Sequence, residues 1–184
     1  MKKEKKHRVC PAELAGGLDN RFRRLLQNPQ KILKPYINKG MTVLDLGCGP
    51  GFFTIDIAQM LSGSGKVIAA DLQDGMLEKV SVKIKGTPLE QIIELHKCQE
   101  DKIGVTEKVD FLLAFWMIHE VPDHDKLFAE LKSILKPGGR IYIIEPKIHV
   151  SDKSFEKMIV QLRNTGFEVL ERPKVFFSRA AIFG

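Results

Sequence analysis

A glycine-rich turn and an acidic residue are the parts of the sequence best suited to chemistry. The segment Val43 to Gly51 reads as a buried strand that runs into a turn containing Gly47, Gly49 and Gly51. Glycines let the backbone approach a ligand closely, and the helix that follows offers unpaired N–H groups and a partial positive end. Asp71 ends the next apolar run, where its carboxylate can accept hydrogen bonds from both hydroxyls of a ribose. Together the turn and the acid predict a nucleoside-binding site.

The spacing of the glycines helps to separate two kinds of nucleoside site. The dinucleotide pattern G-x-G-x-x-G needs a third glycine or an alanine for close helix packing, and Phe52 occupies that position here. A catalytic Tyr-x-x-x-Lys pair is also missing, because neither Tyr36 nor Tyr142 has a lysine four residues later. An NAD(P)-dependent oxidoreductase is therefore the second choice of enzyme.

The elements that must position these residues follow from the hydrophobic pattern. From Met41 onward, short apolar runs alternate with amphipathic segments of helical length, which predicts parallel strands joined by crossover helices. In such a sheet the ligand crevice lies at the carboxyl ends of the strands, where the strand order reverses. We expect strands at 42–47, 66–71, 92–97, 109–115 and 140–145, and helices at about 51–62, 74–85, 123–136 and 152–165.

The two ends of the chain predict different structures. Residues 1–8 carry most of the formal charge of +6, so we expect a basic, disordered tail over 1–12. Asn28 and Pro29 provide an N-cap and a first-turn proline, which predicts an N-terminal helical cap over 13–40 before the main domain, 41–184. After Gly166, which suits a left-handed helix cap, 167–184 should form an antiparallel hairpin, with Pro173 placing its first strand at a sheet edge.

Composition favours one compact domain without a metal. A chain of 184 residues with 43% hydrophobic content suits a single core, and no apolar run is long enough to cross a bilayer. The N-terminus has Lys and Glu where a secretory signal would be apolar, so we expect a cytoplasmic protein. Cys10, Cys48 and Cys98 are too scattered for a disulfide framework or a zinc pair, and we interpret them as small apolar fillers.

Four segments in order resemble the class I S-adenosylmethionine-dependent methyltransferases of the small-molecule type. Asp45 to Gly51 is similar to the family's first motif, and Asp71 to Leu77 to its ribose and adenine segment. Ala114 to Val121 resembles the exit of the fourth strand, and Leu135 to Arg140 the turn into the fifth. The resemblance implies a Rossmann-like α/β fold: a seven-stranded, mostly parallel sheet with helices on both faces, strand order 3-2-1-4-5-7-6 and a C-terminal antiparallel hairpin.

The resemblance also assigns residues to the cofactor S-adenosylmethionine. Family members hold the ribose with the acid after the second strand and flank the adenine with the apolar residues that follow. Where many members bond the adenine amino group with an Asp, this chain reads Lys97 to Asp101, so Gln99, Glu100 or a backbone group would substitute. The expected cofactor-binding set is Asp45, Gly47, Cys48, Gly49, Gly51, Asp71, Leu72, Met76, Gln99, Glu100, Ala114 and Phe115.

The residues after the fourth strand are candidates for the acceptor side. His119 should face the methyl end of the cofactor, where it could remove a proton from the acceptor; the alternative is a histidine that fixes the loop or simply packs. Glu120 could orient His119 or lie in solvent. Trp116 could stack on the acceptor or serve as a core or lid residue. We expect the acceptor's walls to come from 116–121 and from the region Arg21 to Tyr36, with Tyr36 itself among the contacts.

The sequence thus predicts an S-adenosylmethionine-dependent methyltransferase that leaves S-adenosylhomocysteine as product. A sulfonium is a good methyl donor, so positioning and water exclusion should supply much of the rate of an SN2 transfer to a small-molecule acceptor. Nucleic acid is disfavoured as acceptor, because the fourth-strand exit lacks an Asn/Asp-Pro-Pro-aromatic signature and the body of the chain is nearly balanced in charge. A catalytically silent, cofactor-binding partner subunit is the alternative from another class. The acceptor, and whether the protein is a monomer or a homodimer, stay open.

Overall fold

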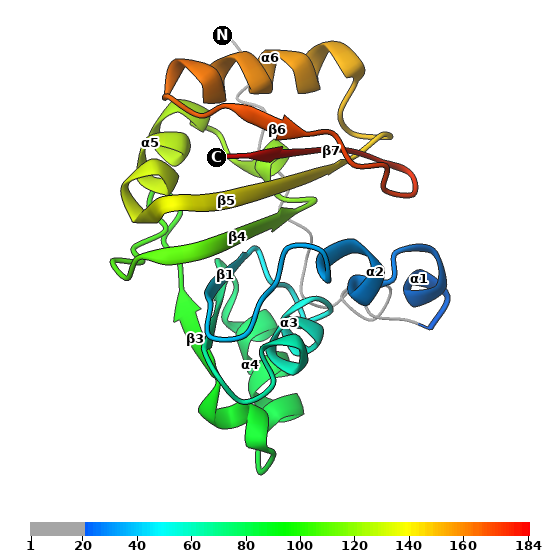
Figure 1. The fold of residues 1–184 in the computed structure, drawn as a ribbon, viewed down its shortest axis with the longest axis vertical. Helices are drawn as coiled ribbons and strands as arrows, with labels where there is room; N and C mark the ends of the chain where they lie inside the picture. Colours follow the sequence, from blue (N-terminus) through cyan, green and yellow to red (C-terminus); the bar gives the residue numbers. More distant parts are fainter. Residues whose placement is uncertain (1–20) are drawn as a thin grey trace, which may run out of the picture.

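A seven-stranded sheet forms the centre of the molecule in the computed structural model, which describes residues 21–184 (Figure 1). The strands lie in the order β3-β2-β1-β4-β5-β7-β6; β1 to β5 run parallel, and β7 is antiparallel to both of its neighbours. This order and the terminal hairpin confirm the predicted fold. The strands are β1 Thr42–Leu46, β2 Lys66–Asp71, β3 Ile93–Lys97, β4 Val109–Phe115, β5 Leu135–Pro146, β6 Val169–Glu171 and β7 Ser178–Phe183.

Helices cover both faces of the sheet. Buried side chains of α2, α3 and α4 pack on one face, and those of α5 and α6 pack on the other. Strand β4 shows the consequence for the sequence: Phe111 and Leu113 point into the first core and Leu112 into the second, so the run is apolar throughout. The helices are α1 Arg21–Leu26, α2 Pro29–Leu33, α3 Thr54–Leu61, α4 Asp74–Ile84, α5 His124–Ile134 and α6 Asp152–Asn164, with 3-10 turns η2 Pro88–Gln91 and η3 Ile118–Glu120.

Strand β5 begins earlier than the sequence predicts. Helix α5 ends at Ile134, and the segment expected to be a turn pairs with β4 through a register shift between Val109 and Phe111. Two glycines permit this irregular start: Gly138 has φ +75°, and a Cβ at Gly139 would lie 2.9 Å from the Leu135 side chain. The irregular pairing therefore replaces the predicted turn.

The predicted signals at the chain ends have mixed outcomes. The Asn28 side chain caps α2 by accepting a hydrogen bond from the Lys31 N–H, and Gly166 ends α6 with φ +86°, so both predictions are confirmed. Strand β6 lies at the sheet edge as expected, but Pro173 follows it in the β6–β7 connection. The predicted tail 1–12 and the first part of the predicted cap lie outside the described residues.

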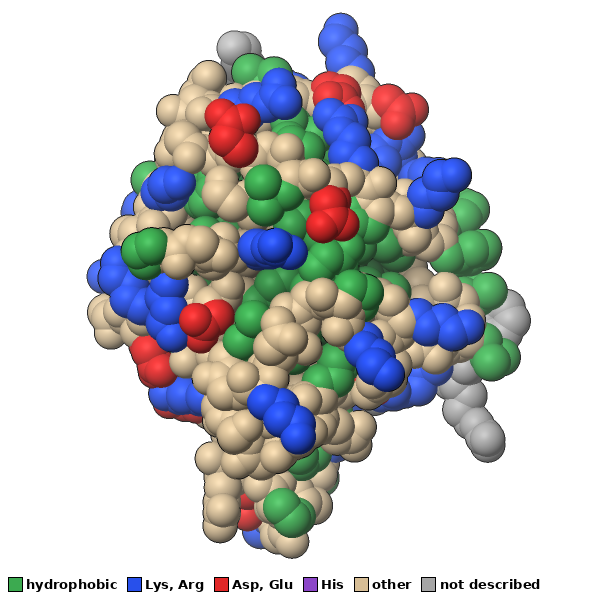
Figure 2. Space-filling model, in the orientation of Figure 1, with side chains coloured by type: hydrophobic (Ala, Val, Ile, Leu, Met, Phe, Trp, Pro, Cys, Tyr) green, Lys and Arg blue, Asp and Glu red, His purple; other side chains and the backbone are tan. Residues whose placement is uncertain are grey.

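The described surface has no dominant charged patch on the face that Figure 2 draws, where Lys and Arg side chains are spread among acidic and hydrophobic ones. Over residues 21–184, no helix has the length and the apolar character that a membrane crossing requires.

Candidate functional site

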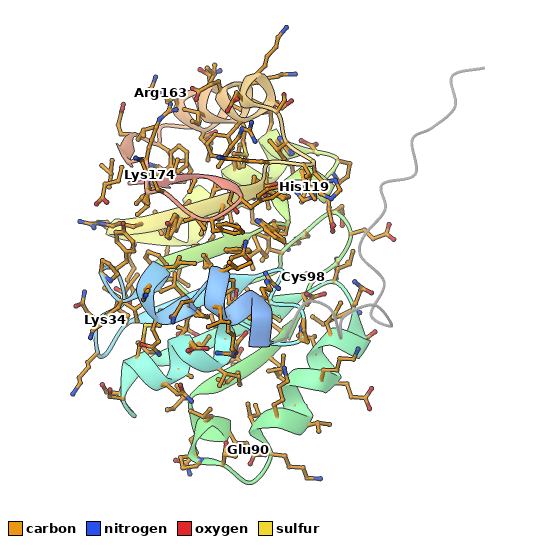
Figure 3. The ribbon with its side chains drawn as sticks, turned by 90° about the vertical axis from the view of Figure 1, so that its right-hand side faces the viewer. Lys34, Glu90, Cys98, His119, Arg163 and Lys174 are labelled. Carbon is orange, nitrogen blue, oxygen red and sulfur yellow. The ribbon has the colours of Figure 1, made fainter. Side chains whose placement is uncertain are left out.

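The carboxyl ends of the central strands border a cavity of about 690 Å³, a size typical of small-molecule sites. It lies where the strand order reverses between β1 and β4, as the topology predicts. Cys98 and His119, both in its lining, lie on the right-hand side of the view in Figure 3. The predicted residues that line it are Asp45, Gly47, Cys48, Gly49, Asp71, Leu72, Met76, Gln99, Glu100, Phe115, Trp116, His119 and Glu120.

The three glycines of the turn after β1 have different roles. All have positive φ, but a Cβ at Gly47 would lie 2.9 Å from Met117 Cβ and one at Gly51 would lie 3.1 Å from Val80 Cγ2. At Gly49 such an atom would meet nothing within 4 Å. Gly51 is therefore a packing position, which agrees with its absence from the cavity lining, whereas Gly49 leaves the backbone open to a ligand.

Asp71 joins the turn to the end of β2. Its Oδ2 accepts a hydrogen bond of 2.9 Å from the Gly49 N–H, and its Oδ1 accepts one of 2.8 Å from the Gln73 N–H. Burial raises the pKa of Asp71, although the backbone N–H groups of Gln73 and Gly49 and the charge of Lys97 oppose that effect. Because each carboxylate oxygen has a second lone pair, Asp71 can hold the turn and still accept hydrogen bonds from a ligand.

Asp45 is the second buried acid of the cavity. The Thr54 hydroxyl on α3 donates a hydrogen bond of 2.6 Å to its Oδ2. Burial raises the pKa of Asp45 to about 7, the hydrogen bond from Thr54 opposes this, and the charge of Asp71 adds to it. A cationic ligand beside Asp45 would favour its ionised form.

The loop after β3 closes the far side of the cavity. The Cys98 N–H donates to the Asp71 carbonyl oxygen, and Gln99 pairs with Lys102. Glu130 on α5 holds the next turn by accepting hydrogen bonds from the Ile103 and Gly104 N–H groups. Glu130 was not predicted, because nothing in its helical context marks it as a partner of a distant loop.

His119 is oriented by a buried carboxylate from β5. Its Nδ1 lies 2.5 Å from Glu145 Oε2, and Glu145, only 1% exposed, also accepts a hydrogen bond of 2.9 Å from the Ile118 N–H. Burial alone would lower the pKa of His119, but the hydrogen bond and charge of Glu145, with a contribution from Glu120, raise it above its usual value. The His119 ring also stacks on His149, with centroids 5.4 Å apart.

The sequence analysis did not identify Glu145 as the partner of His119. The prediction offered Glu120 as the group that could orient His119, but the hydrogen bond comes from Glu145. One signal could have found it: Glu145 ends an apolar strand, as Asp71 does. An acid at such a position points to the same edge of the sheet as the ligand crevice.

Trp116 belongs to a group of aromatic rings at the cavity, and the Arg23 guanidinium packs against these rings. Trp116 has φ +59°, a strained conformation for a large side chain, and its indole N–H donates a hydrogen bond of 3.0 Å to Ser178 Oγ. The Arg23 guanidinium carbon lies 4.3 Å from the ring centroid of Phe52, 5.3 Å from that of Phe115 and 5.1 Å from that of Trp116. Helix α1 therefore adds a cation and the exit of β4 adds the rings.

Besides Gly51, two predicted residues do not line the cavity. Tyr36 packs against Phe111 and Tyr142, and its hydroxyl donates a hydrogen bond of 3.0 Å to Glu171. Burial, helped by Glu171, raises the pKa of Tyr36 to about 12. Ala114 is fully buried in the core under α5 and α6. The structure thus brings Arg23, and not Tyr36, from the N-terminal region to the site.

The cysteines in the described part of the chain have the environment of buried thiols. Cys48 and Cys98 are free and buried, and burial raises the pKa of both thiols, which keeps them protonated. Cys10 lies outside the described residues. Over 21–184, no group of three or more His, Cys, Asp or Glu side chains is placed to hold a metal ion.

Comparison with known proteins gives a consistent result. A family model described as a methyltransferase domain matches residues 37–172. A demethylmenaquinone methyltransferase of Lactobacillus johnsonii is 33% identical over 110 residues, which cover 59% of this chain and 45% of that protein. The ubiquinone/menaquinone biosynthesis C-methyltransferase UbiE of Francisella tularensis is 32% identical over 117 residues, 63% of this chain and 47% of that one. The chain therefore spans about half the length of the curated relatives it matches.

A solved structure matches over almost the whole chain. The crystal structure of a SAM-dependent methyltransferase from Aquifex aeolicus superposes with a TM-score of 0.83 and 30% sequence identity, covering 95% of this chain and 99% of that one. The similarity therefore includes both the turn after β1 and the terminal hairpin.

Proposed function

We propose that this chain, which belongs to the class I S-adenosylmethionine-dependent methyltransferases, transfers the cofactor's methyl group to a small aromatic acceptor with a weakly acidic hydroxyl. One observation carries the proposal: the imidazole of His119, held by Glu145, lines the same cavity as the unit formed by Asp71 and Gly49. A nucleoside and an acceptor can therefore meet in one cavity.

The residues at one end of the cavity fit S-adenosylmethionine. Asp71 would accept the ribose hydroxyls, Leu72 and Met76 would flank the adenine, and Gln99 offers an amide beside them. Asp45 and the open backbone at Gly49 suit the charged amino acid end. When bound, the cofactor supplies a methyl group on a positively charged sulfur.

His119 would act as the general base for the acceptor. Because Glu145 engages Nδ1, Nε2 is the ring nitrogen left to take a proton from an acceptor hydroxyl. The carboxylate of Glu145 would stabilise the imidazolium that forms, which is the role of the acid in Ser-His-Asp triads. The raised pKa makes His119 a stronger base, and it is available in its neutral form above that pKa.

An aromatic acceptor suits the wall of the cavity beside His119. Phe115 and Trp116 offer ring faces, and Arg23 adds a cation that can stabilise a deprotonated oxygen. The names of the relatives from Lactobacillus johnsonii and Francisella tularensis refer to menaquinone and ubiquinone, which supports a hydroquinone-type ring. Removal of its hydroxyl proton makes the oxygen and the ring carbon ortho to the hydroxyl group nucleophilic. After methylation on carbon, that carbon loses its own proton to restore the aromatic ring.

A cytoplasmic location is part of the proposal. Cys48 and Cys98 are unpaired thiols in the core, which suits a reducing compartment. Fractionation of cells that express the full-length chain, with a periplasmic or secreted marker as control, would test this point.

Methyl transfer from labelled S-adenosylmethionine to a panel of hydroquinones, catechols and aromatic amines tests the proposed reaction. We expect transfer to a hydroquinone, and we expect His119→Asn to abolish most of it without changing the affinity for S-adenosylhomocysteine. Cofactor binding without transfer to any member of the panel would instead favour the silent partner subunit.

A further inference from the structure

Five exposed apolar side chains gather at one side of the molecule, next to the cavity. Leu25 on α1 is 81% exposed, Ile148 after β5 is 70% exposed, and Phe176 and Phe177 in the β6–β7 connection are 53% and 52% exposed. Leu26 belongs to the same surface. Figure 2 shows hydrophobic side chains at the right-hand edge, where α1 and the β6–β7 connection lie in Figure 1. We call these five residues the apolar face.

Contacts within the molecule join the segments that carry the apolar face. Leu25, Leu26 and Phe176 line a second hollow of about 340 Å³. The Gln27 side-chain amide donates to the Phe176 carbonyl oxygen, and the Lys147 N–H donates to that of Phe177, so α1 and the segment after β5 are both tied to the loop. A contiguous exposed apolar patch of this kind marks an interaction site in a water-soluble domain.

The backbone at Phe177, one of the two exposed phenylalanines, adopts a costly conformation. Phe177 has φ +56°, a region that bulky side chains avoid. The loop is fixed around it, because the Ser178 N–H donates to the Val175 carbonyl and Ser178 Oγ to that of Phe176, while the same Oγ accepts the Trp116 indole N–H. A strained residue in a fixed loop often marks a functional position, which supports a role for the exposed Phe177 ring.

Lysines surround the apolar face and give it a charge preference. Lys31 and Lys174 line the hollow with Leu25, Leu26 and Phe176, and Lys147 directly precedes Ile148. None of the three lysines has an ion-pair partner within 21–184, whereas the nearby acids are engaged. Those acids are Glu171 with the Tyr36 hydroxyl, Asp152 with Arg179 and Glu156 with Arg172.

We propose that the apolar face lies on the surface of an anionic lipid bilayer. Phenylalanine rings enter the boundary between head groups and acyl chains, and lysines reach anionic head groups with long flexible stems, so this combination suits a lipid surface better than an aqueous partner. The opening of the cavity would then lie close to the bilayer, since Ile148 lines both the apolar face and the cavity. Entry of an amphiphilic acceptor from the lipid rests on the proposed function; the attachment itself does not.

Co-sedimentation of the full chain with vesicles tests the attachment without any cofactor or acceptor. We expect binding to vesicles of equal parts phosphatidylglycerol and phosphatidylcholine, much weaker binding to phosphatidylcholine alone, and a decrease with added salt. Phe176→Ser combined with Phe177→Asn removes both rings and should weaken binding at least tenfold. Asn is chosen at 177 because it tolerates the left-handed conformation, so the fold is kept. Lys147→Gln combined with Lys174→Gln should remove most of the preference for anionic lipid.

Matched variants keep the result interpretable. Val82→Ser combined with Val160→Ser removes two exposed apolar side chains from α4 and α6 and should leave binding unchanged. A further variant tests the contribution of the basic N-terminal segment to vesicle binding by replacing Lys2, Lys3, Lys5, Lys6 and Arg8 with Gln. Vesicle binding that persists in this variant supports attachment through the apolar face.

Three results would overturn the proposal. They are no binding of the unmodified chain to anionic vesicles, equal binding by the double phenylalanine variant, or a dimer of the unmodified chain that is lost in that variant, which would make the apolar face an interface between two copies. S-adenosylhomocysteine binding, measured in parallel, reports on the proposed function independently.

Discussion

The two ends of the cavity are built in different ways. At the proposed cofactor end, Gly49 in the turn after β1 and Asp71 at the end of the neighbouring strand β2 meet through a hydrogen bond from the Gly49 backbone N–H to the Asp71 carboxylate. At the proposed acceptor end, the contacts are between side chains that come from α1, the exit of β4 and the end of β5; the residues are Arg23, Trp116, His119 and Glu145. The first end is a property of the fold, whereas the second depends on which side chains this particular chain brings to the edge of the sheet.

Removal of His119 is the change with the largest expected effect, and it separates the two ends most sharply. His119→Ala should lower kcat by about 10²- to 10⁴-fold, because a general base typically contributes that much. The affinity for S-adenosylhomocysteine, measured by calorimetry, should stay within about twofold, a change of about 0.4 kcal/mol. His149→Ala, which removes the stacked neighbour, is the control, and an equal loss there would argue that His119 only packs.

Removal of Asp71 is the corresponding change at the other end. Asp71→Ala should weaken S-adenosylhomocysteine binding by about 10- to 100-fold, since hydrogen bonds to a charged group contribute about 1.5–3 kcal/mol. The exposed Asp74, three residues further on, provides the control Asp74→Ala, which should leave the affinity unchanged. Calorimetry measures the affinity of both variants for S-adenosylhomocysteine. Equal affinities in the two variants would show that Asp71 does not bind the cofactor.

The hydrogen bond between Glu145 and His119 gives a prediction about pH. Since the charge of Glu145 raises the pKa of His119 and the neutral imidazole is the base, activity in the unmodified chain should rise with pH through that raised pKa. In Glu145→Gln the pKa falls, so the rise should move to lower pH, while the maximal kcat decreases by about tenfold because the ring loses its charged partner. A pH–kcat profile that keeps its midpoint in Glu145→Gln would contradict the assignment, and Glu145→Asp should restore part of the original profile.

Tyr36 should show the smallest effect, because it lies outside the cavity. Tyr36→Phe removes an exposed hydrogen bond to Glu171 and should cost about 0.5–1.5 kcal/mol of stability or less. Neither kcat nor cofactor affinity should change. Thermal unfolding measures the stability, and the methyl transfer assay measures the activity. A loss of activity at constant stability would indicate that Tyr36 contacts the acceptor after all.

The contrast between the two ends also explains what the sequence could predict. The positions of the parallel strands, Asp71 and the glycine turn were predictable because local patterns encode them: apolar runs, strand-end acids and positive-φ glycines. The strand order was predictable only through the resemblance to a known family. Glu145 was missed because its partner His119 lies 26 residues away in sequence and becomes a neighbour only through the pairing of β4 with β5. Arg23 replaced Tyr36 for a similar reason, since which residues of α1 and α2 face the cavity depends on how these helices dock.

The most direct test of the account is calorimetry of the unmodified chain with S-adenosylhomocysteine and, in parallel, with NAD⁺ and NADP⁺. We predict saturable binding of S-adenosylhomocysteine, with no heat from either dinucleotide. Saturable heat from a dinucleotide, with none from S-adenosylhomocysteine, would contradict the claim that Gly49 and Asp71 hold an S-adenosyl group at one end of the cavity.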